Sequence, residues 1–155
     1  MKHRLCILTL LTLVTFVHAQ GHERPDLSGQ WDLNLEKSNL EADWTEGITG
    51  GTFDILHQEP DFKLSRVFEF KRKKKQAFEI RTDGPEQKGK FKTTWYMVWR
   101  ESRLFLTVLR KGMENTVEYY LSSTGELIAD ERFTSSRMNY HNRWVFDNAP
   151  DVTPD

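Results

Sequence analysis

Four polar or charged side chains interrupt strand faces that are otherwise apolar in this sequence. His57, Arg66, Glu131 and Asn142 each stand where the alternation of the surrounding segment predicts an apolar residue. Side chains two positions apart on a strand share a face, so each of the four should point inward. A buried charge is costly unless it is paired. The pattern therefore predicts either an internal ion pair between Arg66 and Glu131, with His57 and Asn142 hydrogen-bonded to neighbours, or a polar anchor inside a binding cavity.

The second alternative assigns the carboxylate of a lipid-like ligand to Arg66, assisted by Tyr140. The tail of that ligand would lie against aromatic residues of the predicted inner faces, namely Trp95, Trp99, Tyr119 and Trp144. An apolar pocket with a few polar groups is the usual design of a small-molecule site. Aromatic residues in strands also serve as ordinary core, so both roles stay open for these four.

The groups that catalysis or metal binding would need do not gather in the sequence. Asp54 and His57 are three positions apart on a predicted strand and face opposite ways. His57 and Glu59 share a face, but no serine or cysteine stands near them in a recognisable nucleophile motif. HExxH, paired CxxC, phosphate-loop and dinucleotide-binding motifs are missing. We therefore expect a protein that is not an enzyme and uses no metal and no cofactor.

Strands must position these residues, because apolar residues recur at every second position from Gly29 onward. The alternation predicts strands over residues 29–34, 52–58, 62–71, 76–82, 91–100, 103–110, 116–121, 127–135 and 138–146. Short connections without helices favour an antiparallel up-and-down meander, and eight or nine such strands can close into a barrel. We expect one all-β domain over residues 26–147.

One connection is long, from residue 35 to residue 51. Ser38 and Glu41 fit a capping box, which predicts a short helix beginning near Asn39. That helix would carry Leu40 and Trp44, and the connection would cover one end of the barrel as a lid.

Residues 1–19 have the order of a cleavable secretory signal. Lys2 and Arg4 are followed by an apolar stretch over residues 5–17 and by small residues before Gln20. The stretch is shorter than the roughly 20 residues of a membrane span. Cys6, the only cysteine, lies inside the signal, so the mature chain has no disulfide and no lipid anchor. We expect an exported protein, periplasmic or extracellular, with no transmembrane anchor and with a disordered tail over residues 148–155.

Charge narrows the choice of partners. The chain has 22 Lys and Arg against 23 Asp and Glu, and removal of Lys2 and Arg4 leaves 20 against 23, which argues against nucleic acid. One basic run joins two predicted strands and consists of Lys71, Arg72, Lys73, Lys74 and Lys75. The run is either a solvated hairpin tip or a docking patch for anionic lipid or polysaccharide. The latter alternative makes the chain a non-enzymatic interaction module that docks an envelope partner.

The tripeptide Gly29-Gln30-Trp31, within residues 26–38, resembles the opening of the lipocalin-like proteins that many Gram-negative and acidobacterial species export. The resemblance continues through TDGPE at residues 82–86, Trp99 with Leu104, and LSSTGEL at residues 121–127, which looks like the closing hairpin of that family. It implies a monomeric barrel that holds a small apolar or amphipathic molecule. It also implies that an arginine of the last strand, Arg143 or alternatively Arg137, covers Trp31 at one barrel end. The missing disulfides and the basic run depart from the family.

Overall fold

The computed structural model describes residues 23–149, which form eleven β-strands and two short 3-10 helices. In chain order these are β1 (Gly29–Leu33), β2 (Asn39–Leu40), η1 (Asp43–Thr45), β3 (Gly50–Gln58), β4 (Asp61–Glu69), β5 (Lys74–Arg81), β6 (Gln87–Lys88), η2 (Lys90–Lys92), β7 (Thr94–Arg100), β8 (Arg103–Arg110), β9 (Met113–Leu121), β10 (Leu127–Ser135) and β11 (Asn139–Asn148). The all-β prediction is confirmed. The predicted signal at residues 1–19 lies outside the described residues.

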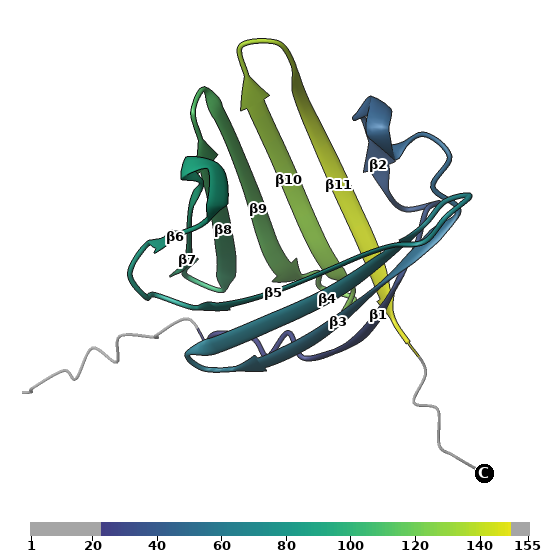
Figure 1. Cartoon of the computed structure of the whole chain (residues 1–155). Coiled ribbons are helices and arrows are strands. Elements are labelled where there is room, and N and C mark those ends of the chain that lie inside the picture. The colour runs from purple at the N-terminus through teal and green to yellow at the C-terminus, as the bar shows by residue number, and fades with distance from the viewer. Residues whose placement is uncertain (1–22, 150–155) are drawn as a thin grey trace, which may run out of the picture.

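All strands belong to one antiparallel sheet in the order β5-β4-β3-β1-β11-β10-β9-β8-β7-β6, with β2 paired to β11 off this path. The sheet curls into a half-barrel (Figure 1). Its two edges meet through the rings of Phe78 and Trp95, whose centroids are 6.1 Å apart, and through an isolated bridge between Thr82 and Met97. The meander is as predicted, but side chains rather than a continuous ladder join its edges.

The strand count exceeds the eight or nine predicted because β2 and β6 have only two residues each, too few to show an alternation. The bounds of β8 and β10 agree with the prediction. The domain runs slightly past its predicted end at residue 147. Asn148 belongs to β11, and the Ala149 N–H donates to the Gln30 carbonyl at 2.9 Å.

The predicted capping-box helix in the long connection is wrong. The Ser38 hydroxyl donates to the Asn34 carbonyl at 2.7 Å and accepts the Val145 N–H at 3.0 Å, so it ties the chain to β11 instead of capping a helix. Asn39 and Leu40 then pair with β11 as β2. Within this connection, helical structure is confined to η1, which contains Trp44.

Alternation along the strands brings one apolar face of the sheet inside, where burial of this surface drives folding. Residues that are completely buried include Leu27, Phe62, Leu104, Leu127 and Phe146. Gly29 and Trp31 lie on β1 as the sequence motif requires, and Trp31 is 4% exposed with its indole N–H donating to the Leu27 carbonyl at 3.1 Å.

Because consecutive strands are antiparallel, alternate connections gather at the same end of the barrel. The open end, uppermost in Figure 1, carries residues 34–49, 70–73, 89–93, 111–112 and 136–138. The closed end carries residues 24–28, 59–60, 82–86 and 122–126. In the part of the chain that the structure describes, no helix is long and apolar enough to cross a membrane.

Gly51 on β3 tests this packing. A Cβ at this position would lie 2.9 Å from the Val67 carbonyl oxygen of β4 and 3.1 Å from the Phe68 ring. We expect Gly51→Ala to lower the free energy of unfolding by about 1–3 kcal/mol, measured by urea unfolding followed through tryptophan fluorescence. Gly89→Ala is the control, since its nearest contact would be 3.6 Å away, and we expect a change within about 0.5 kcal/mol. Equal losses for the two variants would contradict the register of β3 against β4.

Candidate ligand-binding site

A polar layer crosses the interior of β9, β10 and β11 toward the open end. Its centre is Glu131, which is 7% exposed. One carboxylate oxygen accepts the Asn115 amide at 3.0 Å, and the other accepts the Asn142 amide at 3.0 Å and the Trp144 indole N–H at 3.1 Å. Three neutral donors thus compensate the loss of water around this charge.

Asn142 also fixes the segment that covers the open end. Its side chain is fully buried, and its carbonyl oxygen accepts the Glu41 N–H at 2.8 Å and the Ala42 N–H at 3.1 Å. Through this one amide, the polar layer determines where η1 and Trp44 lie.

Arg66 faces the polar layer from β4. Its Nε donates to the Gln76 side chain at 2.8 Å, and its guanidinium carbon lies 5.7 Å from the centre of the Phe68 ring. The predicted ion pair between Arg66 and Glu131 is wrong, because neutral groups hold the Glu131 carboxylate. The two residues instead line one cavity of about 30 Å³. Its other walls are Trp44, Phe53, Phe68, Val117, Tyr119, Ala129 and Trp144.

Tyr119 leaves its hydroxyl group without a partner on this cavity. The side chain is completely buried, and the oxygen has no hydrogen bond to any described residue; the Asn115 carbonyl oxygen shares this condition. Burial raises the pKa of Tyr119 to about 12, with the positive charge of Arg66 opposing the rise and the negative charge of Glu131 adding to it. Unpaired buried polar groups are uncommon. The hydroxyl is therefore an unused hydrogen-bonding group beside a guanidinium.

Trp44 separates this cavity from a larger pocket at the open end. The inner cavity has room for about one or two water molecules. The outer pocket measures about 280 Å³ and is lined by Glu41, Ala42, Asp43, Trp44, Met138, Asn139 and Tyr140. The Trp44 ring lies 5.7 Å from Trp144 and 6.1 Å from Phe68, and the residue is 41% exposed. Displacement of this one side chain would join the two spaces.

The structure brings together part of the predicted site. Arg66, Tyr119 and Trp144 line the inner cavity, while Tyr140 lines the outer pocket and stacks on Phe133 at 5.0 Å. Burial, followed by the negative charge of Glu131, raises the pKa of Tyr140.

Other predicted site residues lie elsewhere. Trp95 packs at the seam against Phe78, and Trp99 lies at the closed end, so neither contacts the cavity. Leu40 is held in β2 and packs against the core. In the basic run, Lys71, Arg72 and Lys73 form the β4–β5 connection, and Lys74 and Lys75 begin β5.

The prediction that Arg143 covers Trp31 is wrong. Arg143 donates to the Tyr120 hydroxyl at 2.9 Å on the outer wall. Its neighbours Asn142 and Trp144 point inward, so the alternation of β11 requires Arg143 to point outward. The alternative, Arg137, is exposed in the β10–β11 connection.

Asn115 and Gln76 were missed by the sequence analysis. Asn115 shares the inner face of β9 with Val117 and Tyr119, and Gln76 shares that of β5 with Phe78. Their two-residue spacing was the available signal.

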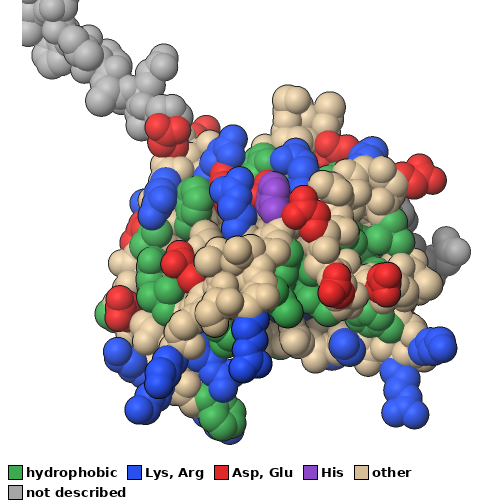
Figure 2. Space-filling view, turned by 90° about the horizontal axis from the view of Figure 1, so that it is seen from above, with side chains coloured by type: hydrophobic (Ala, Val, Ile, Leu, Met, Phe, Trp, Pro, Cys, Tyr) green, Lys and Arg blue, Asp and Glu red, His purple; other side chains and the backbone are tan. Residues whose placement is uncertain are grey.

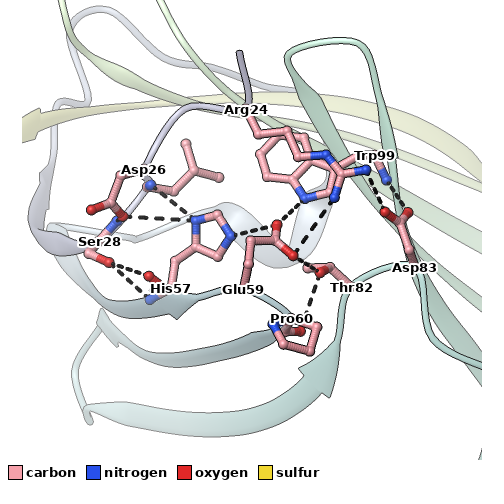
Figure 3. Close-up of polar contacts among 10 residues, drawn as sticks. Arg24, Asp26, Ser28, His57, Glu59, Pro60, Thr82, Asp83 and Trp99 are labelled. Atoms are coloured by element: carbon pink, nitrogen blue, oxygen red, sulfur yellow. Dashed lines mark hydrogen bonds and ion pairs between the residues drawn. The ribbon is translucent and has the colours of Figure 1, made fainter. Parts of the chain in front are cut away.

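A second polar network closes the other end of the barrel (Figure 3). This closed-end network comprises Arg24, Asp26, Ser28, His57, Glu59, Thr82, Asp83 and Trp99. Glu59 accepts hydrogen bonds from Thr82, from the Trp99 indole and, at 3.1 Å, from His57 Nε2. The Leu27 N–H donates to His57 Nδ1 at 3.4 Å, so the proton of the imidazole resides on Nε2.

The closed-end network does not place Ser28 and His57 as a nucleophile and its general base. The Ser28 hydroxyl donates to the His57 backbone carbonyl and accepts the His57 backbone N–H, both at 3.0 Å. It therefore bonds the backbone of His57 and not the imidazole ring. Arg24 pairs with Asp83 at 2.7 Å and lies 5.6 Å from the Trp99 ring. Among residues 23–149, no cluster of His, Cys, Asp or Glu side chains could hold a metal ion.

Comparisons with known proteins show the fold. No protein-family profile and no curated protein matches the sequence. Among solved structures, the REP1-NXSQ fatty acid transporter is similar, with a TM-score of 0.58 and 10% identity over 79% of this chain and 96% of that one. Fatty-acid-binding protein 1 of Echinococcus granulosus gives a TM-score of 0.56 and 11% identity over 79% and 97% of the two chains.

Secretory abundant heat soluble protein 4 from Ramazzottius varieornatus also matches, with a TM-score of 0.50 and 14% identity over 79% and 94% of the two chains. Such low identities concern the fold alone. The architecture is that of the β-barrel fold that these three structures share.

The closed-end network predicts an acid-sensitive contribution to stability. Burial of Glu59 opposes ionisation, but hydrogen bonds from Thr82, His57 and Trp99 outweigh it and lower the pKa of this carboxyl below 4.5. The ionised form is therefore favoured by folding, and its contribution is present above pH 4.5 and is lost as the pH falls through the lowered folded-state pKa.

We expect Glu59→Gln to cost about 1–2 kcal/mol at neutral pH. Its stability should then fall less on acidification than that of the unchanged chain. Urea unfolding between about pH 7 and pH 3 measures this difference. Glu79→Gln, on the exposed outer wall, is the control, and its stability should fall on acidification as much as that of the unchanged chain. Parallel acid curves for Glu59→Gln and the unchanged chain would rule out the assignment.

Proposed function

We propose that this chain is an exported, non-enzymatic carrier that binds one small amphipathic molecule inside the barrel. The observation that carries the proposal is the fully buried Tyr119 hydroxyl, which has no hydrogen-bond partner among residues 23–149 and lines an interior cavity together with Arg66. Buried hydroxyl groups in packed cores are usually paired.

The polar head of the ligand would bind at Arg66 and Tyr119. Arg66 bonds Gln76 through Nε, and no described residue accepts a hydrogen bond from its terminal amino groups. A carboxylate can accept from both of these groups and from the Tyr119 hydroxyl. Glu131 repels such an anion, and the head is therefore held on the β4 side of the cavity.

The tail would extend toward the open end. Phe68 and Trp144 give apolar walls to the inner cavity, and Met138 and Tyr140 continue them in the outer pocket. The inner cavity of about 30 Å³ is too small for an acyl chain, so binding requires Trp44 to move outward and join it to the pocket of about 280 Å³. Trp44 thereby acts as the lid.

Two further observations support the proposal. The similar solved structures include a fatty acid transporter and a fatty-acid-binding protein. The charge, apolar and small-residue order of residues 1–19 supports export.

Titration with a fluorescent fatty acid tests the carrier. The probe protein begins at Gln20 and retains all described residues. Tyr119→Phe should weaken binding about tenfold to a hundredfold, because one hydrogen bond to a charged head is lost. The empty variant should be as stable as the unchanged chain or more stable, since an unpaired buried hydroxyl is removed. Arg66→Gln should weaken binding more than Tyr119→Phe.

Tyr120→Phe is the matched control, because that hydroxyl bonds Arg143 on the outer wall. It should leave fatty-acid affinity unchanged. Absence of saturable binding, or equal affinity of Tyr119→Phe and the unchanged chain, would refute the carrier. Native mass spectrometry of the purified protein adds a direct search for a retained molecule.

A further inference from the structure

Phe91 at the open end is 78% exposed, more than any other large apolar residue in the described part of the chain. It lies in η2 with a φ of 57°, and Lys92 follows with a φ of 58°. Residues other than glycine rarely adopt this left-handed backbone conformation. Hydrogen bonds from the Gly89 N–H to the Thr93 carbonyl at 2.8 Å and from the Thr93 N–H to the Lys90 carbonyl at 3.2 Å close the loop. The loop therefore holds the phenyl ring out in solvent instead of folding it onto the barrel.

Basic side chains surround this ring. Lys88, Lys90 and Lys92 flank it in sequence, and the Arg110 guanidinium of β8 lies 5.4 Å from its centre. An exposed aromatic ring among cations is the composition of segments that bind the interface of anionic membranes.

The basic run at residues 71–75 lies at the same end of the barrel. Lys74 Nζ is 4.7 Å from the centre of the Phe70 ring, which repeats the pairing of a cation with an aromatic ring. Seen from above, Lys and Arg side chains gather at the lower left, around a protruding hydrophobic side chain, and again at the lower right (Figure 2). The acidic residues Glu41, Asp43 and Glu46 belong to the separate segment around η1. Lys73 pairs with Glu69 at the end of β4 at 2.9 Å, and the other basic side chains of the two connections have no carboxylate partner among the described residues.

We infer that the open end docks on an anionic phospholipid bilayer, with Phe91 inserted among the headgroups and with the basic connections 71–75 and 88–92 on the lipid phosphates and carboxylates. The charge of this end, opposite to that of the whole chain, selects an anionic surface. The projecting ring selects a bilayer over a soluble polyanion, because only a bilayer offers an apolar layer beneath its charges. Docking in this way places Trp44 and the outer pocket near the membrane, although the inference does not depend on ligand binding.

Vesicle co-sedimentation tests the docking. The protein again begins at Gln20, because residues 5–17 are apolar enough to bind lipid themselves. We expect binding to phosphatidylcholine vesicles with about 30% phosphatidylserine at about 0.1 M salt, and its loss at high salt or without phosphatidylserine. Each basic side chain near such a surface contributes about fivefold, so Lys90→Glu with Lys92→Glu should weaken binding more than tenfold. Phe91→Ala should weaken it as well.

Lys63→Glu with Arg81→Glu is the charge-matched control, because both residues lie on the outer walls of β4 and β5 and pair with Glu79 and Asp61. This control should retain most of the binding, although it carries the same change in net charge. Equal loss in both double variants would overturn the docking surface and leave only a global charge effect.

A fluorophore at residue 91 tests insertion directly. Cys6 is the only cysteine, so Phe91→Cys in the chain from Gln20 takes a single environment-sensitive label, and Leu56→Cys, on the outer wall and 57% exposed, is the control site. Anionic vesicles should shift the emission of the label at residue 91 and leave that at residue 56 unchanged. No shift at residue 91, or equal affinity for vesicles and for soluble heparin, would overturn the bilayer in favour of plain polyanion binding.

Discussion

Glu131 imposes the constraint on which the interior depends. A carboxylate at 7% exposure inside an apolar barrel must be surrounded by donors, and Asn115, Asn142 and Trp144 supply them from the two neighbouring strands, β9 and β11. The inner face therefore cannot be filled with aliphatic side chains at this level. Residues nearer the closed end are completely buried, and a small cavity with Arg66 and Tyr119 on its walls remains beside Glu131.

The same buried charge also affects the position of the segment around η1, which covers the open end. Asn142 donates to Glu131 and accepts from Glu41 and Ala42, so the buried charge and the position of η1 are linked through one amide. Trp44 contributes to the walls of both the inner cavity and the outer pocket. At the closed end, hydrogen bonds of His57, Glu59 and Trp99 join the N-terminal segment to β3, to the connection after β5 and to β7. These bonds lie at the end of the barrel opposite the outer pocket.

Periodicity along the chain predicted which residues face inward, and it did so for Arg66, Tyr119, Glu131 and Asn142. It could not predict how far along the barrel axis each side chain lies, or which side chains meet across the interior. Trp95, Trp99 and Trp144 all face inward, yet their positions along their strands place only Trp144 at the cavity. The predicted ion pair between Arg66 and Glu131 is wrong for the same reason, because Asn115 and Trp144 donate to the Glu131 carboxylate instead. The helix predicted from Ser38 is wrong because a hydroxyl that can cap a helix can equally bond a neighbouring strand.

The central claim is that an amphipathic ligand lies with its head at Arg66 and Tyr119 and its tail toward Trp44. Its most direct test is a crystal structure of the chain from Gln20 grown with a fatty acid that carries bromine on its terminal carbon, with the bromine located by anomalous scattering. The account predicts a carboxylate between the Arg66 guanidinium and the Tyr119 hydroxyl, a displaced Trp44 ring, and a bromine peak between Met138 and Tyr140. A bromine peak at the closed end, or an interior without ligand while Trp44 keeps its place against Trp144, would contradict it.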